Sequence, residues 1–310
     1  MTMANRILPE KRRAKLKELL SERRLVRAIE AHSGLSALIS SEAAGNGHDS
    51  RHFDALWVSS LTSSAARGLP DMELYALERR LELIDEILGA SDKPLIVDGD
   101  TGGDANAFEY LCARLESAGV SAVVVEDKQH PKRNSLSLTS SHVLEEPETF
   151  GRKLYRGRKV LLSPDFRVFA RLESLIAGET VEDALLRARI YVDHGAHGVM
   201  IHSKEREPTS VLRFLDRFRE QGFTQPVICV PTTYNNVRAE ELHARGANIV
   251  IHANHLLRAA HFAMRQVCRS LLENDRSMEA DNMITPVSEI FREVGYDAAL
   301  ARDAARDSVS

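Results

Sequence analysis

Few cysteines, no long apolar run and no excess of positive charge set the first limits on this sequence of 310 residues. Its three cysteines, Cys112, Cys229 and Cys268, are scattered and include no CxxC pair, so we expect reduced, buried thiols of a cytoplasmic protein. No apolar stretch approaches the roughly 20 residues that cross a bilayer. The charged N-terminal segment also lacks the apolar centre of a signal peptide. We therefore expect a soluble protein that does not enter a membrane.

The charge balance excludes a second group of partners. Lysine and arginine together number 41 against 45 aspartates and glutamates, which gives a formal net charge of −4. Proteins that bind nucleic acid or an anionic membrane surface by electrostatics carry a basic face. We expect neither partner, and an anionic small molecule must be bound by a local cluster of cations.

Short apolar segments alternate with longer segments of helical character along most of the chain. Continuous apolar runs separated by helices predict a parallel sheet covered by helices. Eight such units in about 230 residues favour a (β/α)₈ barrel of the TIM type, an α/β fold, over an open sheet. No G-x-G-x-x-G or Walker A sequence follows the first run, which weakens the open-sheet alternative. The apolar runs are 25–32, 53–60, 94–100, 121–127, 166–173, 198–204, 227–232 and 248–254. Helical segments between them include 104–118, 180–194, 208–220 and 237–245, and Gly119, Gly195 and Gly246 are suited to end three of them.

The ends of the chain are expected to extend one barrel domain of residues 1–310. In the N-terminal segment 1–24, Leu16, Leu19 and Leu20 share one face of a basic helix, which we expect to cover an end of the barrel. After the eighth run, 255–274 has the pattern of a long helix. The segment 275–310 predicts a helical extension, with one helix at 281–295 and a frayed tail rich in alanine and aspartate.

The longest connection between a strand and a helix is 128–148. Connections longer than about 12–15 residues are uncommon in compact domains unless they are functional or disordered. This one contains proline, several serines and three basic residues before Ser135. We therefore predict a lid over the active site.

Three carboxylates lie at the ends of two neighbouring apolar runs. Asp98 and Asp100 are two residues apart, so both side chains face the same side of their strand, and Glu126 ends the next strand. In barrel enzymes the carboxyl ends of the strands form the active site. Three carboxylates repel one another unless a cation intervenes, and hard oxygen ligands suit Mg²⁺. Pairing with arginine, or a simple turn in VDGDTGGDAN, is the alternative for these acids.

Other strand ends carry groups that suit an anionic ligand. Arg171 can bind a carboxylate or phosphate with two hydrogen bonds, although it could instead pair with Glu173. His202 ends another strand and is expected to face the same opening. Ser59 and Ser60 follow the strand that carries Trp57, and their hydroxyl and backbone N–H groups can surround an anion.

Two further positions are ambiguous from pattern alone. Asp71 could cap the helix that follows it. Lys132 and Asn134 lie in the predicted lid, where PKRNS could also be a solvated turn.

Several of these segments resemble the phosphoenolpyruvate mutase branch of the isocitrate lyase superfamily, over about residues 25–275. The most specific is EDKQHPKRNSL at 126–136, which is similar to the family's EDK-x-x-PK-x-NSL lid motif. The others are EAHSGLSA (30–37), LWVSSLTSS (56–64), DGDTGG (98–103), ARLESLIAG (170–178), MIHSK (200–204) and IHANHLLRA (251–259).

The resemblance implies an Mg²⁺-dependent isomerase of phosphonate biosynthesis that interconverts phosphoenolpyruvate and phosphonopyruvate. Asp98 would hold Mg²⁺, with Asp100 and Glu126 acting largely through its waters. Ser59, Ser60, Leu61 and Arg171 would bind the carboxylate and carbonyl end of the substrate, and Trp57 would be a further substrate-binding residue. Lys132, Asn134 and Ser135 would close over the phosphoryl group, Asn134 and His202 would contact it, and Asp71 would help to order the site. The implied catalytic residues are Asp71, Lys132, Asn134 and His202. The resemblance also implies a homotetramer, a dimer of dimers that exchanges the helix 255–274.

Two departures from the family pattern and three alternatives remain. Many relatives have glycine at Ser60, and others have Gly-Tyr-Gly where this chain has Gly102-Gly103-Asp104. Phosphonopyruvate hydrolase is the first alternative, but hydrolases carry threonine where this chain has Asn134. A carbon–carbon lyase is less favoured because the stretch DKQHPKRNS lacks the cysteine of the lyase K-[KR]-C-G-H segment. A barrel that only binds its ligand is disfavoured by the complete set of charged residues.

Overall fold

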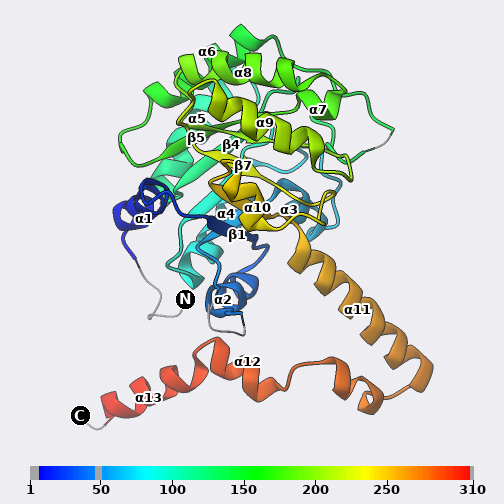
Figure 1. Cartoon of the computed structure of the whole chain (residues 1–310). Coiled ribbons are helices and arrows are strands. Elements are labelled where there is room, and N and C mark those ends of the chain that lie inside the picture. Colours follow the sequence, from blue (N-terminus) through cyan, green and yellow to red (C-terminus); the bar gives the residue numbers. More distant parts are fainter. Residues whose placement is uncertain (1–6, 46–50, 138, 308–310) are drawn as a thin grey trace.

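Eight parallel strands close into a barrel in the computed structural model, which describes residues 7–45, 51–137 and 139–307 (Figure 1). Each strand pairs with the next one along the chain, and β8 pairs with β1. The strands are β1 (Val26–Glu30), β2 (Ala55–Val58), β3 (Leu95–Asp98), β4 (Ala122–Glu126), β5 (Arg167–Leu172), β6 (Gly198–Ile201), β7 (Val227–Cys229) and β8 (Ile249–His252). All eight lie within the predicted apolar runs, and the predicted barrel is confirmed.

Helices follow the strands and cover the outside of the barrel (Figure 1). Local chemistry sets several of their ends: the Asp104 and Thr180 side chains accept hydrogen bonds from the first turns of α5 and α8, and Gly119 ends α5 with φ of 95°. The covering helices are α2 (Gly34–Glu42), α3 (Ser60–Ala65), α4 (Leu77–Ala90), α5 (Ala105–Ala118), α6 (Pro147–Lys159), α7 (Ser174–Ala177), α8 (Val181–Asp193), α9 (Thr209–Glu220) and α10 (Ala239–Ala244).

The strands bury both of their faces. Trp57, Phe169 and Met200 belong to a cluster that fills the inside of the barrel. Their neighbours along the strands, such as Val58 and Ala170, pack outward against the helices. Since side chains alternate along a strand, continuous apolar runs are what this two-sided burial requires. The packed interior leaves the rim as the place for polar side chains.

The N-terminal end of the barrel is covered by α1 (Pro9–Ser21). Leu16 is fully buried in the cluster inside the barrel, and Leu19 and Leu20 pack against it. The buried Arg12 guanidinium donates to three backbone carbonyls, those of Leu88, Ser91 and Lys93. Residues 1–6 of the predicted segment lie outside the described residues.

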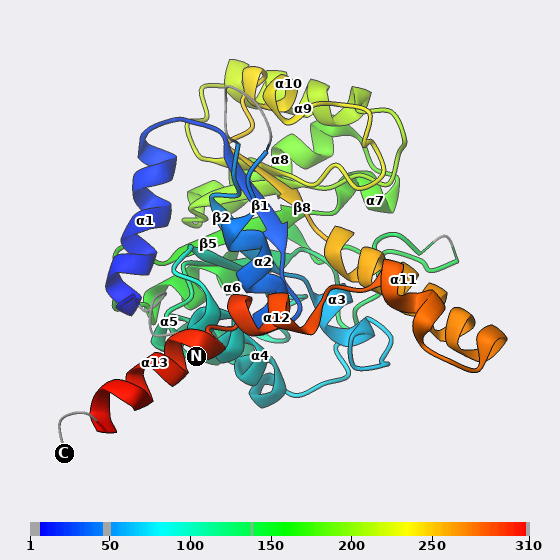
Figure 2. The ribbon, with the colours of Figure 1, turned by 90° about the horizontal axis from the view of Figure 1, so that it is seen from below.

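The C-terminal helices lead away from the barrel and then return beneath α2 (Figures 1 and 2). They are α11 (His255–Asn274), the 3₁₀ helix η2 (Met278–Met283), α12 (Val287–Glu293) and α13 (Tyr296–Asp307). The prediction of one helix at 281–295 was wrong, because Pro286 separates η2 from α12. The expected frayed tail was also wrong, because most of it forms α13. Across the described residues, none of the helices combines the length and apolar character needed to cross a membrane.

Candidate active site

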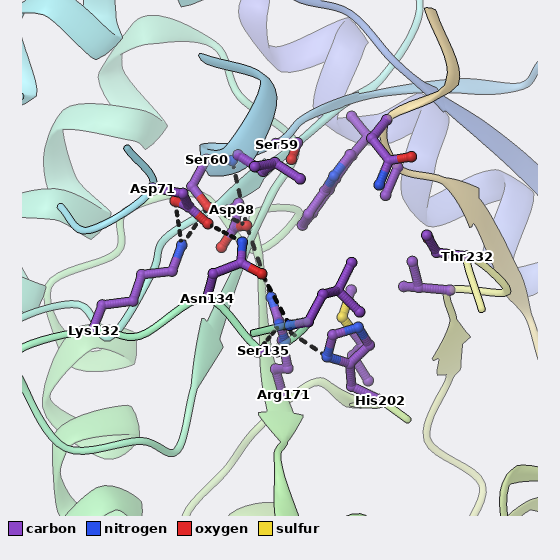
Figure 3. A pocket seen from close by; sticks show the side chains of 17 residues that line it. Ser59, Ser60, Asp71, Asp98, Lys132, Asn134, Ser135, Arg171, His202 and Thr232 are labelled. Carbon is purple, nitrogen blue, oxygen red and sulfur yellow. Dashed lines mark hydrogen bonds and ion pairs between the residues drawn. The ribbon is translucent and has the colours of Figure 1, made fainter. Parts of the chain in front are cut away.

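A pocket opens at the carboxyl ends of the strands, beneath the loop between β4 and α6 (Figure 3). All predicted site residues except Asp100 and Glu126 line it: Trp57, Ser59, Ser60, Leu61, Asp71, Asp98, Lys132, Asn134, Ser135, Arg171 and His202. Its remaining lining residues are Leu136, Met200, Val230, Thr232, Ala253 and Asn254. Sequence positions far apart along the chain thus meet at one rim.

Asp98 and Asp100 end β3 in different surroundings. Asp98 Oδ2 accepts from Ser60 Oγ at 2.9 Å, and Arg171 lies 3.8 Å away. Asp100 instead pairs one oxygen with Arg80 and the other with Lys132. Burial alone would raise the pKa of Asp100, but Lys132 and Arg80 lower it below its ordinary value. Asp98 is therefore the carboxylate that faces the pocket, and Asp100 lies behind it.

Glu126 is fully buried at the end of β4, next to Asp100 and opposite Arg171 in the sheet. Neither of its carboxylate oxygens has a hydrogen-bond partner among the described residues. Lys128 and Arg171 approach to 3.4 and 3.5 Å without forming one. Burial raises the pKa of Glu126 to about 7, although both cations act against the rise. A buried carboxylate with two free oxygens is suited to accept from water or from hydrated metal.

The three predicted metal ligands do not form a closed carboxylate cage. Within the described part of the chain, no group of three or more His, Cys, Asp or Glu side chains is placed to hold a metal ion. The Lys132 ammonium group lies between carboxylates, since it donates to Asp71, Asp100 and Ser60. Asp98 and Glu126 remain the residues whose oxygens suit a hydrated Mg²⁺, which needs few direct protein ligands.

The loop between β4 and α6 is fixed at its base and lies over the pocket. Lys128 and Leu144 form an antiparallel bridge, and Gln129 N donates to Val143 O at 2.9 Å. The predicted lid of 128–148 ends too late, because α6 already begins at Pro147. Residue 138 of this lid lies outside the described residues.

Asp71 accepts hydrogen bonds from the loop between β4 and α6 and does not cap a helix. It accepts from Lys132 Nζ at 2.8 Å and from Asn134 Nδ2 at 2.6 Å (Figure 3). The helix after it, α4, begins six residues later with no side-chain cap. The capping alternative is therefore wrong.

The Asn134 amide has a defined orientation. Its Oδ1 accepts from Leu136 N at 2.9 Å while its Nδ2 donates to Asp71. Since the amide nitrogen carries two hydrogens, one N–H remains for a ligand in the pocket. A threonine at this position has a single hydrogen to donate.

Arg171, His202 and the lid residue Ser135 converge on the opposite side of the pocket (Figure 3). Arg171 Nη2 donates to Ser135 Oγ at 2.8 Å, and its Nε pairs with Glu173. Arg171 thus forms the salt bridge to Glu173 that was considered as the alternative, and it also lines the pocket. Burial, followed by the charge of Arg171, lowers the pKa of His202, so its imidazole is neutral at neutral pH.

Two important residues were not predicted as part of the site. Arg80 pairs with Asp100 and donates to Asp98 O at 2.8 Å. Arg80 lies on the buried face of α4 with Leu83, Ile84 and Ile87. An arginine among apolar residues on one helix face is the sequence feature that could have indicated a buried ion pair. Lys128 donates to Ser135 Oγ at 2.7 Å, which the sequence pattern of the lid does not reveal.

The two departures from the family pattern have local explanations. Ser60 Oγ donates to Asp98 and accepts from Lys132, contacts that glycine lacks. Gly102 and Gly103 have φ of 72° and 65°, and a Cβ at Gly102 would lie 2.8 Å from Phe108. Glycine therefore suits this turn after β3.

The sequence profile of the phosphoenolpyruvate phosphomutase family matches residues 16–272. The chain is 34% identical to phosphoenolpyruvate phosphomutase of Tetrahymena pyriformis over 283 residues, which cover 91% of each protein.

Two solved structures are similar over the whole barrel. The crystal structure of phosphoenolpyruvate phosphomutase from Streptomyces platensis subsp. rosaceus has a TM-score of 0.88 at 35% identity, covering 94% of this chain and 98% of that one. The complex of phosphonopyruvate hydrolase with oxalate and Mg²⁺ has a TM-score of 0.85 at 31% identity, with coverage of 94% and 98%.

Proposed function

The chain belongs to the phosphoenolpyruvate phosphomutase family, and from this premise we propose that it is an enzyme that interconverts phosphoenolpyruvate and phosphonopyruvate. The observation that carries the proposal is Asn134, whose oriented amide offers one N–H to the pocket. In the direction of phosphoenolpyruvate, the C–P bond breaks and the phosphoryl group bonds to the oxygen of the same pyruvate skeleton. The reaction needs no second reactant, because substrate and product contain the same atoms.

Transfer of a phosphoryl group passes through a loose, metaphosphate-like transition state, so positioning and charge stabilisation dominate catalysis. The Arg171 guanidinium is the permanent cation nearest His202 and is suited to the substrate's anionic end. Ser59, Ser60 and Leu61 line the same pocket. These groups would keep the pyruvate skeleton still while the phosphoryl group moves.

The migrating group would lie between the lid and β6. Asn134 would donate its free N–H to a phosphoryl oxygen, and Lys132 would supply positive charge nearby. Burial opposes the charge of Lys132, but Asp100 and Asp98 raise its pKa well above the ordinary value. Lys132 therefore stays protonated and serves as a cation and not as a base. Leu136 adds apolar surface to the pocket, which helps to exclude water.

We propose Mg²⁺ as the cofactor, held by Asp98, with Glu126 acting through its waters. Asp100, whose oxygens pair with Arg80 and Lys132, would instead hold Lys132 beside the site. The site has an excess of carboxylates before any substrate binds: Asp71, Asp98, Asp100, Glu126 and Glu173 face Arg80, Lys128, Lys132 and Arg171. An anionic substrate would increase this excess, and bound Mg²⁺ would supply the positive charge that offsets it.

Phosphonopyruvate hydrolase is the second candidate, because its structure is similar to this chain over nearly its full length. The hydrolase requires water to attack the phosphoryl group, whereas the mutase must exclude it. Asn134 and the closed lid favour exclusion. The same arrangement would suit a role in phosphonate biosynthesis.

Assembly and location follow as further proposals. In α11, only Ser270 is buried within the described chain, while Phe262 and Leu272 are 66% and 85% exposed. Apolar side chains this exposed favour burial against other copies, in line with a homotetramer that exchanges α11. The free thiols of Cys112 and Cys229 are buried and suit a cytoplasmic enzyme, whereas the expectation of a buried thiol was wrong for Cys268, which is exposed.

The proposed reaction is tested with an assay coupled to lactate dehydrogenase. Phosphonopyruvate and Mg²⁺ are supplied, with or without pyruvate kinase and ADP. A mutase gives a signal only when pyruvate kinase converts phosphoenolpyruvate to pyruvate. Equal signals in both assays would identify a hydrolase.

A further inference from the structure

Glu173 is a buried carboxylate to which the proposed mechanism assigns no task. It follows β5 two residues after Arg171 and is 0% exposed. Its two oxygens face different segments of the site: one faces residues of the barrel, and the other faces the lid.

The first oxygen, Oε1, contacts two residues of the pocket. It accepts from Arg171 Nε and lies 2.8 Å from His202 Nδ1. Arg171 Nη2 lies 2.9 Å from the same nitrogen, so Nδ1 either donates to Glu173 or accepts from Arg171, according to the tautomer. In both tautomers Nδ1 is engaged by this pair, and Nε2 is the ring nitrogen available to a ligand. Glu173 thereby orients both Arg171 and His202.

The second oxygen, Oε2, contacts the lid. It accepts from Ser135 Oγ at 2.6 Å, and Lys128 Nζ lies 3.3 Å away. Ser135 Oγ also accepts from Lys128 at 2.7 Å and from Arg171 at 2.8 Å. The single hydrogen and both lone pairs of this hydroxyl are thus engaged in hydrogen bonds with protein groups, which leaves none for the substrate in this arrangement.

The backbone of Glu173 is held in place by Asp127. Its backbone N–H donates to Asp127 Oδ1 at 2.9 Å, and Asp127 Oδ2 accepts from Tyr191 at 2.7 Å. Asp127 O also accepts from Glu145 N at 2.8 Å, at the C-terminal base of the lid. The carboxylate therefore has a rigid support that joins β5 to both ends of the lid.

We propose that Glu173 is a positioning residue that couples closure of the lid to the orientation of Arg171 and His202. This inference rests on the proposed function, because it concerns the groups that hold the migrating phosphoryl group. When the lid opens, Ser135 leaves, and both Glu173 and Arg171 lose a hydrogen-bond partner. Arg171 and His202 reach their final orientation only as the lid closes and water is excluded.

The direct test replaces Glu173 with glutamine, which has nearly the same shape. An amide has one accepting oxygen and one donating NH₂ group. In either orientation, the NH₂ group of Glu173→Gln faces groups that donate hydrogen bonds to the wild-type carboxylate, and it cannot accept from them. Glu182→Gln is the matched control, since Glu182 is exposed and pairs with the exposed Arg213 at the surface.

The first readout is the ratio of phosphoenolpyruvate to free phosphate formed from phosphonopyruvate, which does not depend on the fraction of active enzyme. For Glu173→Gln we expect kcat to fall about 10- to 100-fold, because hydrogen bonds to a buried charge are lost. The ratio should shift toward phosphate. Glu182→Gln should match the wild type in both. An unchanged ratio with Glu173→Gln would overturn the coupling.

The second readout needs no substrate, so it separates this inference from the proposed function. Hydrogen exchange of peptides from 130–142 should rise at least about 10-fold in Glu173→Gln relative to α9, which lies outside the site. An equal rise in both regions, or none, would overturn the inference even if the enzyme is a mutase. A selective rise would support it even if the wild type proves to be a hydrolase.

A second variant covers the case in which Glu173→Gln does not fold. Ser135→Ala removes the lid hydroxyl that donates a hydrogen bond to Glu173, while the contacts of Glu173 with Arg171 and His202 stay. Hydrogen exchange of the lid peptides and the release of free phosphate should both rise. Wild-type values for both would contradict the proposal.

Discussion

At the scale of single residues, Asp98 and Asp100 have different surroundings although they are two positions apart. Asp98 lines the pocket and is contacted by Ser60, whereas Asp100 pairs with Arg80 and Lys132. A cation in the pocket therefore meets Asp98 first. Asp100 keeps Lys132 in place for the lid.

Replacement of Asp98 with alanine should lower Mg²⁺-dependent turnover by about 10³-fold or more, since the proposed metal contact is lost. The fold should be retained, because the side chain lies at the rim and outside the packed barrel interior. Asp92→Ala is the control, since Asp92 is half-exposed and pairs with Lys15. Turnover that persists in a chelator would contradict the metal proposal.

The sequence predicted the residues of the pocket better than their partners. Polar residues at strand ends, such as Arg171 and His202, could be identified because the barrel brings strand ends together. The partners come from elsewhere: Arg80 from the middle of α4 and Lys128 from the lid base. Pairing across the fold depends on where helices and loops settle, which local pattern does not encode.

At the scale of elements, backbone hydrogen bonds fix the base of the loop that we propose as a lid. They join 127–129 to 143–145, so we expect any motion of the lid to occur between these two segments. His130 contacts Glu73 at 3.0 Å, and Glu73 accepts from Thr101 Oγ1 at 2.8 Å. The closed lid thus rests on Asp71 and Glu73 of a neighbouring loop.

Cleavage by a protease within 130–142 should slow when Mg²⁺ and oxalate are added, because a ligand that fills the pocket favours the closed lid. The measurement compares cleavage rates by mass spectrometry, with the C-terminal helices as the internal control. The same rate with and without ligand would argue against a gating lid.

The junction of β5 and β6 contains a histidine that must stay neutral. His197 Nδ1 accepts from Val168 N at 2.9 Å, and burial, followed by Arg158 and Arg167, lowers the pKa of His197 to about 3. In the unfolded chain its pKa is about 6.5, so below that pH the unfolded state binds more protons and the free energy of unfolding falls.

The expected loss at pH 5 relative to pH 7 is up to about 2 kcal/mol from His197 alone. His197→Asn keeps an accepting atom and removes the titration, so its stability should decline less over the same range. Urea unfolding of both proteins at the two pH values measures the difference. An equal decline in both would show that His197 is not responsible.

Element positions were predictable and some boundaries were not. Each predicted strand contains the observed one, because burial on both faces requires an apolar run. The C-terminal tail was expected to fray, but Tyr296–Asp307 is helical because alanine has high helix propensity. Composition alone did not separate a solvated helix from a coil.

At the scale of the whole molecule, the apolar surface is concentrated on the C-terminal helices. Phe262 and Leu272 of α11 and Val287 of α12 are each more than 60% exposed. These helices lie away from the barrel (Figure 1). Such a surface is stable in water when it is covered by another copy.

Sedimentation should therefore give four times the monomer mass, with α11 buried between copies. Introducing charge by Phe262→Glu should shift the protein toward smaller species, whereas Leu162→Glu, at an exposed apolar residue remote from α11, should not. A monomer over the full range of concentrations would refute the assembly.

The central claim is that the phosphoryl group stays on the pyruvate skeleton. Phosphorus NMR of phosphonopyruvate with Mg²⁺ and the wild-type enzyme measures this directly, and Asn134→Thr is run beside it. The account predicts that the wild type yields phosphoenolpyruvate with little free phosphate, and that Asn134→Thr forms phosphoenolpyruvate more slowly. Stoichiometric release of phosphate by the wild type would contradict the account and identify a hydrolase.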